Sequence, residues 1–273
     1  MTVAVPTSLR AVRALRGAFV ALALAYLMLP NLVVIPLSFS AQEYLSFPPS
    51  GFSTKWYARL FANRSWVDAA VNSLLIGIPT AGLSMALGTL AALAVVRGGM
   101  RRASLASAIV VAPMMLPHVI LAIGLYPIML ELGMLRSHAA AVIAHTVVGL
   151  PLVFVTVAAA LRGRDGTMEL AAMTLGATPW QVFWKITFPL ILPGIAVGGI
   201  LAFASSFDEL MLSLFLTGAN TRTLPRQMWE QMSDFLTPVI AAAASLIVLF
   251  SLVLLLAVSL LERRPRRTSE GQA

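Results

Sequence analysis

The chain has no cysteine and few charged residues, which together make up 11% of its 273 residues. Without cysteine it can form no disulfide, no thiolate metal site and no cysteine nucleophile. Its only lysines are Lys55 and Lys185, and neither lies in a G-x-x-x-x-G-K-[ST] phosphate-binding loop. The three histidines are scattered without metal-ligand spacing. We therefore expect no metal and no cofactor bound by this chain.

Hydrophobic residues make up 59% of the sequence, and the mean hydropathy is +0.89. Such a chain has hydrocarbon as its main solvent, so it is predicted to be an integral membrane protein. The net charge of +8 comes from short basic clusters beside the apolar runs. A membrane accounts for these clusters better than nucleic acid does.

Six apolar runs are long enough to cross about 30 Å of hydrocarbon. They cover residues 19–39, 71–96, 105–130, 139–161, 190–216 and 239–261. We therefore predict an all-α protein with an N-terminal segment at 1–18, a six-helix transmembrane domain at 19–261 and a C-terminal tail at 262–273. The first run could be a cleavable signal peptide, but it is too long for one and contains Pro30 and Pro36.

Basic residues predict which side of the membrane each loop faces, because cytoplasmic loops carry an excess of Lys and Arg. With six spans both termini lie on one side. Of the 19 basic residues in all, that side holds thirteen: Arg10, Arg13, Arg16, Arg97, Arg101, Arg102, Arg162, Arg164, Lys185, Arg263, Arg264, Arg266 and Arg267. The other side holds six: Lys55, Arg59, Arg64, Arg136, Arg222 and Arg226. Both termini and the loop at 162–187 are thus expected in the cytoplasm.

The loop at 162–187 predicts two short helices separated by a glycine. Thr167 or Asp165 can cap the first helix and Gly176 can end it, while Thr178 and Pro179 have the N-cap and first-turn chemistry of a second helix. Helical spacing places an apolar stripe on the first helix, made by Met168, Ala171, Ala172 and Leu175. Such a stripe indicates a protein partner. The alternative is an amphipathic connector anchored at the headgroups by Trp180 and Trp184.

The spacing within this loop resembles the "EAA" loop of ABC importer permeases, which docks onto the ATPase subunits. Ala171, Ala172, Gly176, Ile186 and Pro189 match in register. The chain departs from the pattern at Leu170, which stands where the family has Glu, and at Phe188, which replaces Leu. The resemblance implies these ATPase-coupling residues: Glu169, Leu170, Ala171, Ala172, Gly176, Ala177 and Pro189.

Nearly the whole chain is similar to spermidine/putrescine-type permeases, and within them to the second, shorter subunit with a MetI-like fold. The matching segments are Pro113–His118, Gly149–Pro151, Ser206–Glu209, Leu216–Gly218 and Leu224–Pro225. This resemblance implies a bacterial inner-membrane subunit that pairs with a second permease, two ATPase subunits that use ATP and Mg²⁺, and an extracytoplasmic substrate-binding protein. The binding protein would meet the external loops at 41–68 and 217–237. Their tryptophans Trp56, Trp66 and Trp229 could equally be interface anchors.

Two carboxylates in the fifth run are the first candidates for the substrate path, because acidic residues inside a membrane span are costly and usually functional. On one continuous helix Asp208 and Glu209 would diverge by about 100°. The candidate path residues are Asp208, Glu209, Ser205, Ser206, Ser213 and His118. The carboxylates suit a cationic amine such as a polyamine, whereas His118 removes an anionic contact that polyamine permeases can carry. A pair at the membrane edge with only an interface role is the alternative.

Other functions compete with polyamine import. Related permeases serve opines, organophosphonates or amino-acid-like compounds, so another cargo is possible. A secondary transporter would show internal repeats, and we find none. An intramembrane enzyme would need a paired acid and base, which diverging carboxylates do not provide. His145, like His118, is most simply a histidine that satisfies a hydrogen bond between helices.

Overall fold

The computed structural model describes residues 7–163, 166–234 and 237–263, and within them the protein is helical with one isolated β-bridge between Ser40 and Phe52. The α-helices are α1 (Thr7–Ser38), α2 (Lys55–Ala62), α3 (Arg64–Val96), α4 (Ala103–Val111), α5 (His118–Glu131), α6 (His138–Arg162), α7 (Thr167–Thr174), α8 (Pro179–Val182), α9 (Phe188–Phe207), α10 (Met211–Leu216), α11 (Leu224–Asp234) and α12 (Pro238–Arg263). The short helices are the 3₁₀ turns η1 (Ala112–Met115) and η3 (Ala219–Thr221) and the π-helix η2 (Phe183–Thr187).

Among these residues, five helices are long and apolar enough to cross a membrane, and a bent pair makes a sixth span if it is counted as one. The expected all-α membrane protein is therefore confirmed. The chain divides into two compact units, residues 1–62 with 231–249 and residues 63–230 with 250–273.

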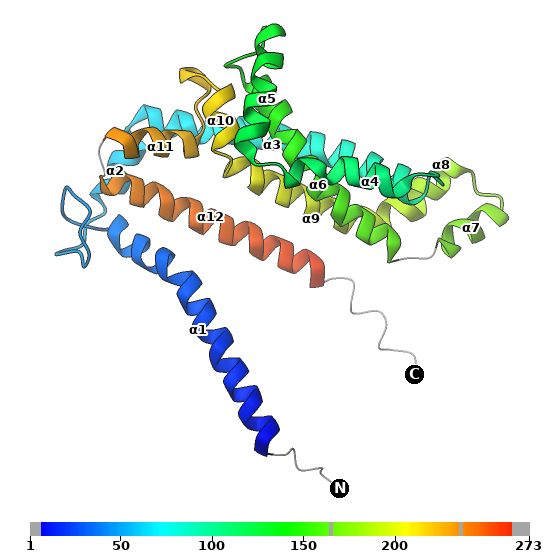
Figure 1. Cartoon of the computed structure of the whole chain (residues 1–273), viewed down its shortest axis with the longest axis horizontal. Helices are drawn as coiled ribbons and strands as arrows, with labels where there is room; N and C mark the ends of the chain where they lie inside the picture. Colours follow the sequence, from blue (N-terminus) through cyan, green and yellow to red (C-terminus); the bar gives the residue numbers. More distant parts are fainter. Residues whose placement is uncertain (1–6, 164–165, 235–236, 264–273) are drawn as a thin grey trace. The chain divides into compact units, whose positions relative to one another are not determined.

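The larger unit is built on α3, α6 and α9, which pack side by side (Figure 1). Its core contains Val95 of α3, Phe154 and Val157 of α6 and Ile191 of α9. Gly88 of α3 lets two of these helices approach closely. A Cβ added there would lie 2.9 Å from the carbonyl oxygen of Leu150, so a larger side chain would force α3 and α6 apart.

The third predicted span is not one straight helix. The segment Ala103–Met115 and the helix His118–Glu131 meet at a bend of 100°. Pro117 causes the break, because its ring disfavours the helical conformation of the preceding residue. Leu116 accordingly has an extended backbone, with φ −86° and ψ 135°.

The fifth predicted span, residues 190–216, is also wrong as a continuous helix. α9 ends at Phe207 and α10 begins at Met211, so Asp208 and Glu209 lie in the break between the two helices. The Glu209 carboxylate accepts a hydrogen bond of 3.1 Å from the backbone N–H of Leu212. It thus satisfies a donor of the first turn of α10 that has no partner within that helix.

In the smaller unit, the loop after α1 folds back onto α2. The Trp56 indole is buried and donates a 2.7 Å hydrogen bond to the carbonyl of Ser40. Trp56 is therefore a core residue and not an interface anchor. In the larger unit Trp66 is buried as well, so of the three tryptophans only Trp229 is exposed.

Candidate functional site

The loop between α6 and α9 has the helix, glycine, helix form that its sequence predicts. Gly176 adopts φ +87°, in the left-handed region that favours glycine. Its N–H donates to the carbonyl of Met173, and the N–H of Ala177 donates to that of Ala172, each at 3.0 Å. These two bonds form a Schellman motif that ends α7.

The start of each short helix tests the predicted caps. Thr178 and Gln181 form a capping box at α8, with Pro179 in the first turn, as expected. For α7 the prediction of Thr167 is wrong, because Thr167 is the first helical residue and Gly166, with φ +66°, stands at the cap. Gly166 offers no side chain for capping, and Asp165 lies outside the described residues.

The apolar side chains of α7 and its C-cap are exposed, including the predicted Met168 and Leu175. They are Met168, Leu170, Met173 and Leu175. Leu175 is 89% exposed. Such a run of exposed apolar side chains marks a surface that contacts a protein partner or the membrane.

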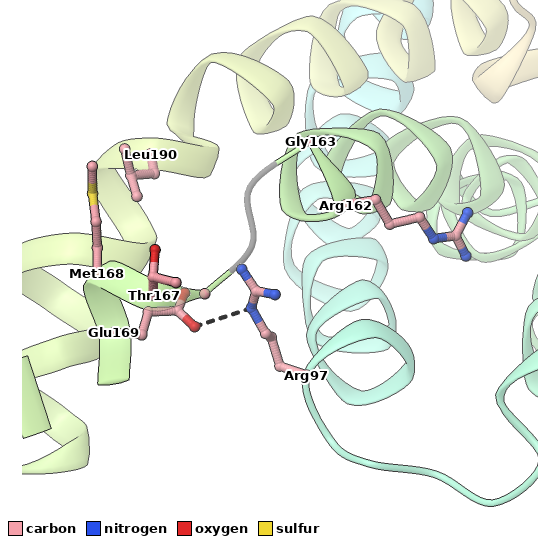
Figure 2. A pocket seen from close by; sticks show the side chains of 8 residues that line it. Arg97, Arg162, Gly163, Thr167, Met168, Glu169 and Leu190 are labelled. Carbon is pink, nitrogen blue, oxygen red and sulfur yellow. Dashed lines mark ion pairs between the residues drawn. The ribbon is translucent and has the colours of Figure 1, made fainter. Parts of the chain in front are cut away.

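Glu169 does not share this exposure, since its side chain is 16% accessible. One carboxylate oxygen lies 3.0 Å from Nε of Arg97, at the end of α3, and the other accepts a 2.9 Å hydrogen bond from the hydroxyl of Thr187 in η2. Figure 2 shows the Arg97 guanidinium facing Glu169, whereas Arg162 points away from it. These contacts join α7 to two other elements. We call Arg97, Glu169 and Thr187 the α7 clamp.

Two residues of the α7 clamp, Arg97 and Glu169, line a cavity of about 490 Å³. Its lining residues are Arg97, Arg162, Gly163, Gly166, Thr167, Met168, Glu169 and Leu190. The cavity lies between the start of α7 and the ends of α3 and α6.

A second polar cluster lies at the two helix breaks. Nδ1 of His118, the first residue of α5, is 2.6 Å from the Glu209 carboxylate. Behind this pair, the ring of His145 on α6 lies 2.8 Å from the hydroxyl of Ser206 and 3.4 Å from that of Ser213. The cluster joins α5, α6, α9 and α10, and its residues come from both broken spans.

Residues 84–267 of the chain match the family model of the binding-protein-dependent transport system inner membrane component. The chain belongs to this family. It is 32% identical over 259 residues to the spermidine/putrescine transport system permease protein PotC of Escherichia coli (strain K12), covering 95% of this chain and 98% of that one. It is 34% identical over 237 residues to the putrescine transport system permease protein PotI of the same strain, covering 83% of each.

A solved structure of similar fold is that of a bacterial ABC transporter involved in the import of the acidic polysaccharide alginate. The two chains superpose with a TM-score of 0.72 at 15% identity, covering 93% of this chain and 98% of that one. The chain therefore has the fold of an ABC importer permease, and it is an inner membrane protein.

Within this permease, four of the six predicted path residues gather in the second cluster: His118, Ser206, Glu209 and Ser213. Ser213 lies on α10, after the break that follows α9, and so is on a different helix from Ser206. The hydroxyl of Ser213 instead reaches the Glu209 backbone carbonyl, at 2.9 Å. Asp208 is exposed and Ser205 is half-buried.

Sequence reasoning missed the partners of Glu169. Arg97 belongs to a basic cluster that indicates membrane topology, and no local pattern links it to Glu169. The hydrogen bond expected of His145 between helices is confirmed by its contact with Ser206. What the sequence could not indicate is that this histidine stands behind the pair of His118 and Glu209.

Proposed function

We propose that this chain is one permease subunit of an ABC importer, lining half of the path for a small cationic solute of the polyamine class. The observation that carries the proposal is identity of 32% to a spermidine/putrescine permease along 95% of the chain. The second cluster and the exposed carboxylate of Asp208 give that path acidic groups in a membrane setting, where they attract cations.

The exposed apolar side chains of α7 support its role as the contact with an ATPase subunit. They lie on a helix that ends at its C-terminus before Gly176 and is attached to the bundle by the α7 clamp. A displacement of α7 would therefore be transmitted to α3 through Arg97. In this proposal two separate ATPase subunits bind ATP and Mg²⁺, and this chain binds neither. The chain has no enzymatic role of its own.

The remaining partners follow from the family, whose members depend on a binding protein. We infer a second permease subunit beside this one and an extracytoplasmic protein that delivers the cargo. The excess of basic residues supports a cytoplasmic location for both termini, residues 1–18 and 262–273, and for the loop at 162–187. The six-helix permease domain then covers residues 19–261.

Transport by the reconstituted complex tests the cargo. The chain is co-purified with its partner permease and ATPase, placed in liposomes and supplied with the binding protein and ATP. We expect ATP-dependent uptake of radiolabelled spermidine or putrescine. Uptake of an opine, an organophosphonate or an amino acid in place of polyamines would contradict the cargo and leave the importer role intact.

Cysteine labelling tests the sidedness, since the chain has no native cysteine to interfere. Leu175→Cys should react with a membrane-impermeant maleimide in inside-out vesicles only. Ala219→Cys, at an exposed position in the loop after α10, should react in right-side-out spheroplasts only. The reverse pattern would place α7 outside the cell and exclude it as the ATPase contact.

A further inference from the structure

We propose that Arg226 is a positioning residue that links α11 to the break before α10, with α10 as the connecting element. The inference rests on the proposed importer function, in which an extracytoplasmic binding protein meets the loop at 217–237 that carries α11. It gives this loop a means of moving the cluster around Glu209, in addition to a surface for contact.

The first support is that an arginine of α11 holds the C-terminal end of α10. Nη1 of Arg226 donates to the backbone carbonyl of Thr217 at 2.6 Å, to the Thr217 hydroxyl at 2.9 Å and to the Ser213 carbonyl at 3.4 Å. Thr217 is the C-cap of α10. The last carbonyls of a helix lack partners within it, and a cation at this end also complements the helix dipole. α10 is therefore fastened to α11 at its end.

The second support is that Glu209 holds the other end of the same helix. Its carboxylate accepts the N–H of Leu212 at 3.1 Å, and its backbone carbonyl accepts the hydroxyl of Ser213 at 2.9 Å. The helix between the two attachments has six residues, a length of about 9 Å. Ser213 contacts both Glu209 and Arg226. A displacement of the C-terminal end of α10 is therefore carried to Glu209 within two helical turns.

The third support is that the guanidinium of Arg226 is itself held in place. Its side chain is 17% exposed, and its Nε lies 2.8 Å from the carboxylate of Glu230, one turn further along α11. Arg226 thus uses Nε for a bond within α11 and Nη1 for the bonds to α10. The rigid fork of a guanidinium can make both at once, whereas a lysine presents a single nitrogen on a flexible chain.

A purely structural role makes a different prediction. α11 has a second attachment, to α3, because the N–H of Leu224 donates to the hydroxyl of Ser73 at 2.8 Å. If Arg226 only folds α11 against the bundle, its loss deforms the external loop and weakens the affinity of the binding protein. If Arg226 links α11 to α10, its loss leaves that affinity unchanged and removes the effect that binding has on the rest of the complex.

The experiment uses the complex of this chain with its partner permease and ATPase in lipid nanodiscs, and the cognate binding protein purified with its cargo. Two quantities are measured on one preparation: the ratio of ATP hydrolysis with and without the binding protein, and the Kd of the binding protein. We expect Arg226→Gln to lower the ratio by roughly tenfold, the size expected for one lost charge-assisted hydrogen bond, with no change in Kd. The matched control is Ser73→Ala, which loosens α11 from α3 only and should leave the ratio unchanged.

An unchanged ratio in Arg226→Gln would overturn the proposal, and so would a raised Kd that accounts for the lost stimulation. An equal loss in Ser73→Ala would assign the link to α3 and exclude α10. If Arg226→Gln does not assemble, Arg226→Lys keeps the charge but cannot bind Glu230 and Thr217 together, so full stimulation in that variant would likewise refute the link. Failure of the proposed function looks different: the unaltered complex would then show no stimulation by the binding protein, and the role of Arg226 would fall with it.

Discussion

The α7 clamp predicts that Arg97 and Glu169 act as one unit in coupling. The perturbation is the pair of neutral variants Arg97→Gln and Glu169→Gln, alone and together. The N···O distance is 3.0 Å, and the side chains are 29% and 16% exposed. Charge-assisted hydrogen bonds of this kind contribute about 1.5–3 kcal/mol, and exposed pairs about 0.2–1 kcal/mol. For this partly buried pair we expect an interaction energy of about 1–2 kcal/mol, between those two ranges.

An interaction of that size corresponds to a change of roughly 5- to 30-fold in an equilibrium constant. The assay is the number of cargo molecules transported per ATP hydrolysed in proteoliposomes, measured for each variant. We expect either single variant to lower this ratio several-fold, and the double variant to lower it no further than the worse single. Arg162→Gln is the control, because Arg162 lines the same cavity but points away from Glu169 (Figure 2).

The competing explanation is that Glu169 contacts the ATPase directly. In that case Glu169→Gln would reduce coupling and Arg97→Gln would not. Additive losses in the double variant would likewise refute the clamp, because residues that act through one contact cannot lose it twice. Either outcome would show that the contact between Arg97 and Glu169 does not carry the coupling.

Three further predictions concern other parts of the chain. Gly176→Pro should abolish coupling of ATP hydrolysis to transport while membrane insertion is retained, because proline cannot adopt φ +87° and has no N–H for the Schellman motif; full transport would refute the docking role. Gly88→Val should lower the thermal stability of the purified chain by about 1–3 kcal/mol through overpacking against α6, and an unchanged melting curve would contradict the close approach. Arg59 and Lys55 beside Glu43 lower the pKa of that carboxyl below its ordinary value of 4.5. These two basic side chains therefore stabilise the loop fully above pH 4.5, and the stabilisation is lost as the pH falls through the lowered pKa of Glu43. In Glu43→Gln the melting temperature should vary less with pH across that acid range.

Local chemistry made much of the loop at 162–187 predictable. Gly176 and the pair Thr178 and Pro179 act through their own backbones and nearest neighbours, so the end of α7 and the start of α8 follow from the sequence. The same holds for the spans, since hydropathy depends only on composition along about 20 residues. The third and fifth spans were predicted as continuous helices, and this was wrong for an equally local reason. Pro117 and the carboxylate of Glu209 interrupt runs that hydropathy alone joins together.

The sequence by itself determined the membrane class, the family and the form of the α7–α8 loop, because each depends on residues close together in the chain. Only the tertiary structure decided the partners of the two important carboxylates. Arg97 reaches Glu169 because α3 and α6 pack along their length, and His118 reaches Glu209 because two interrupted spans place their breaks side by side. Contacts of this kind depend on helix packing across long separations, which no local pattern encodes.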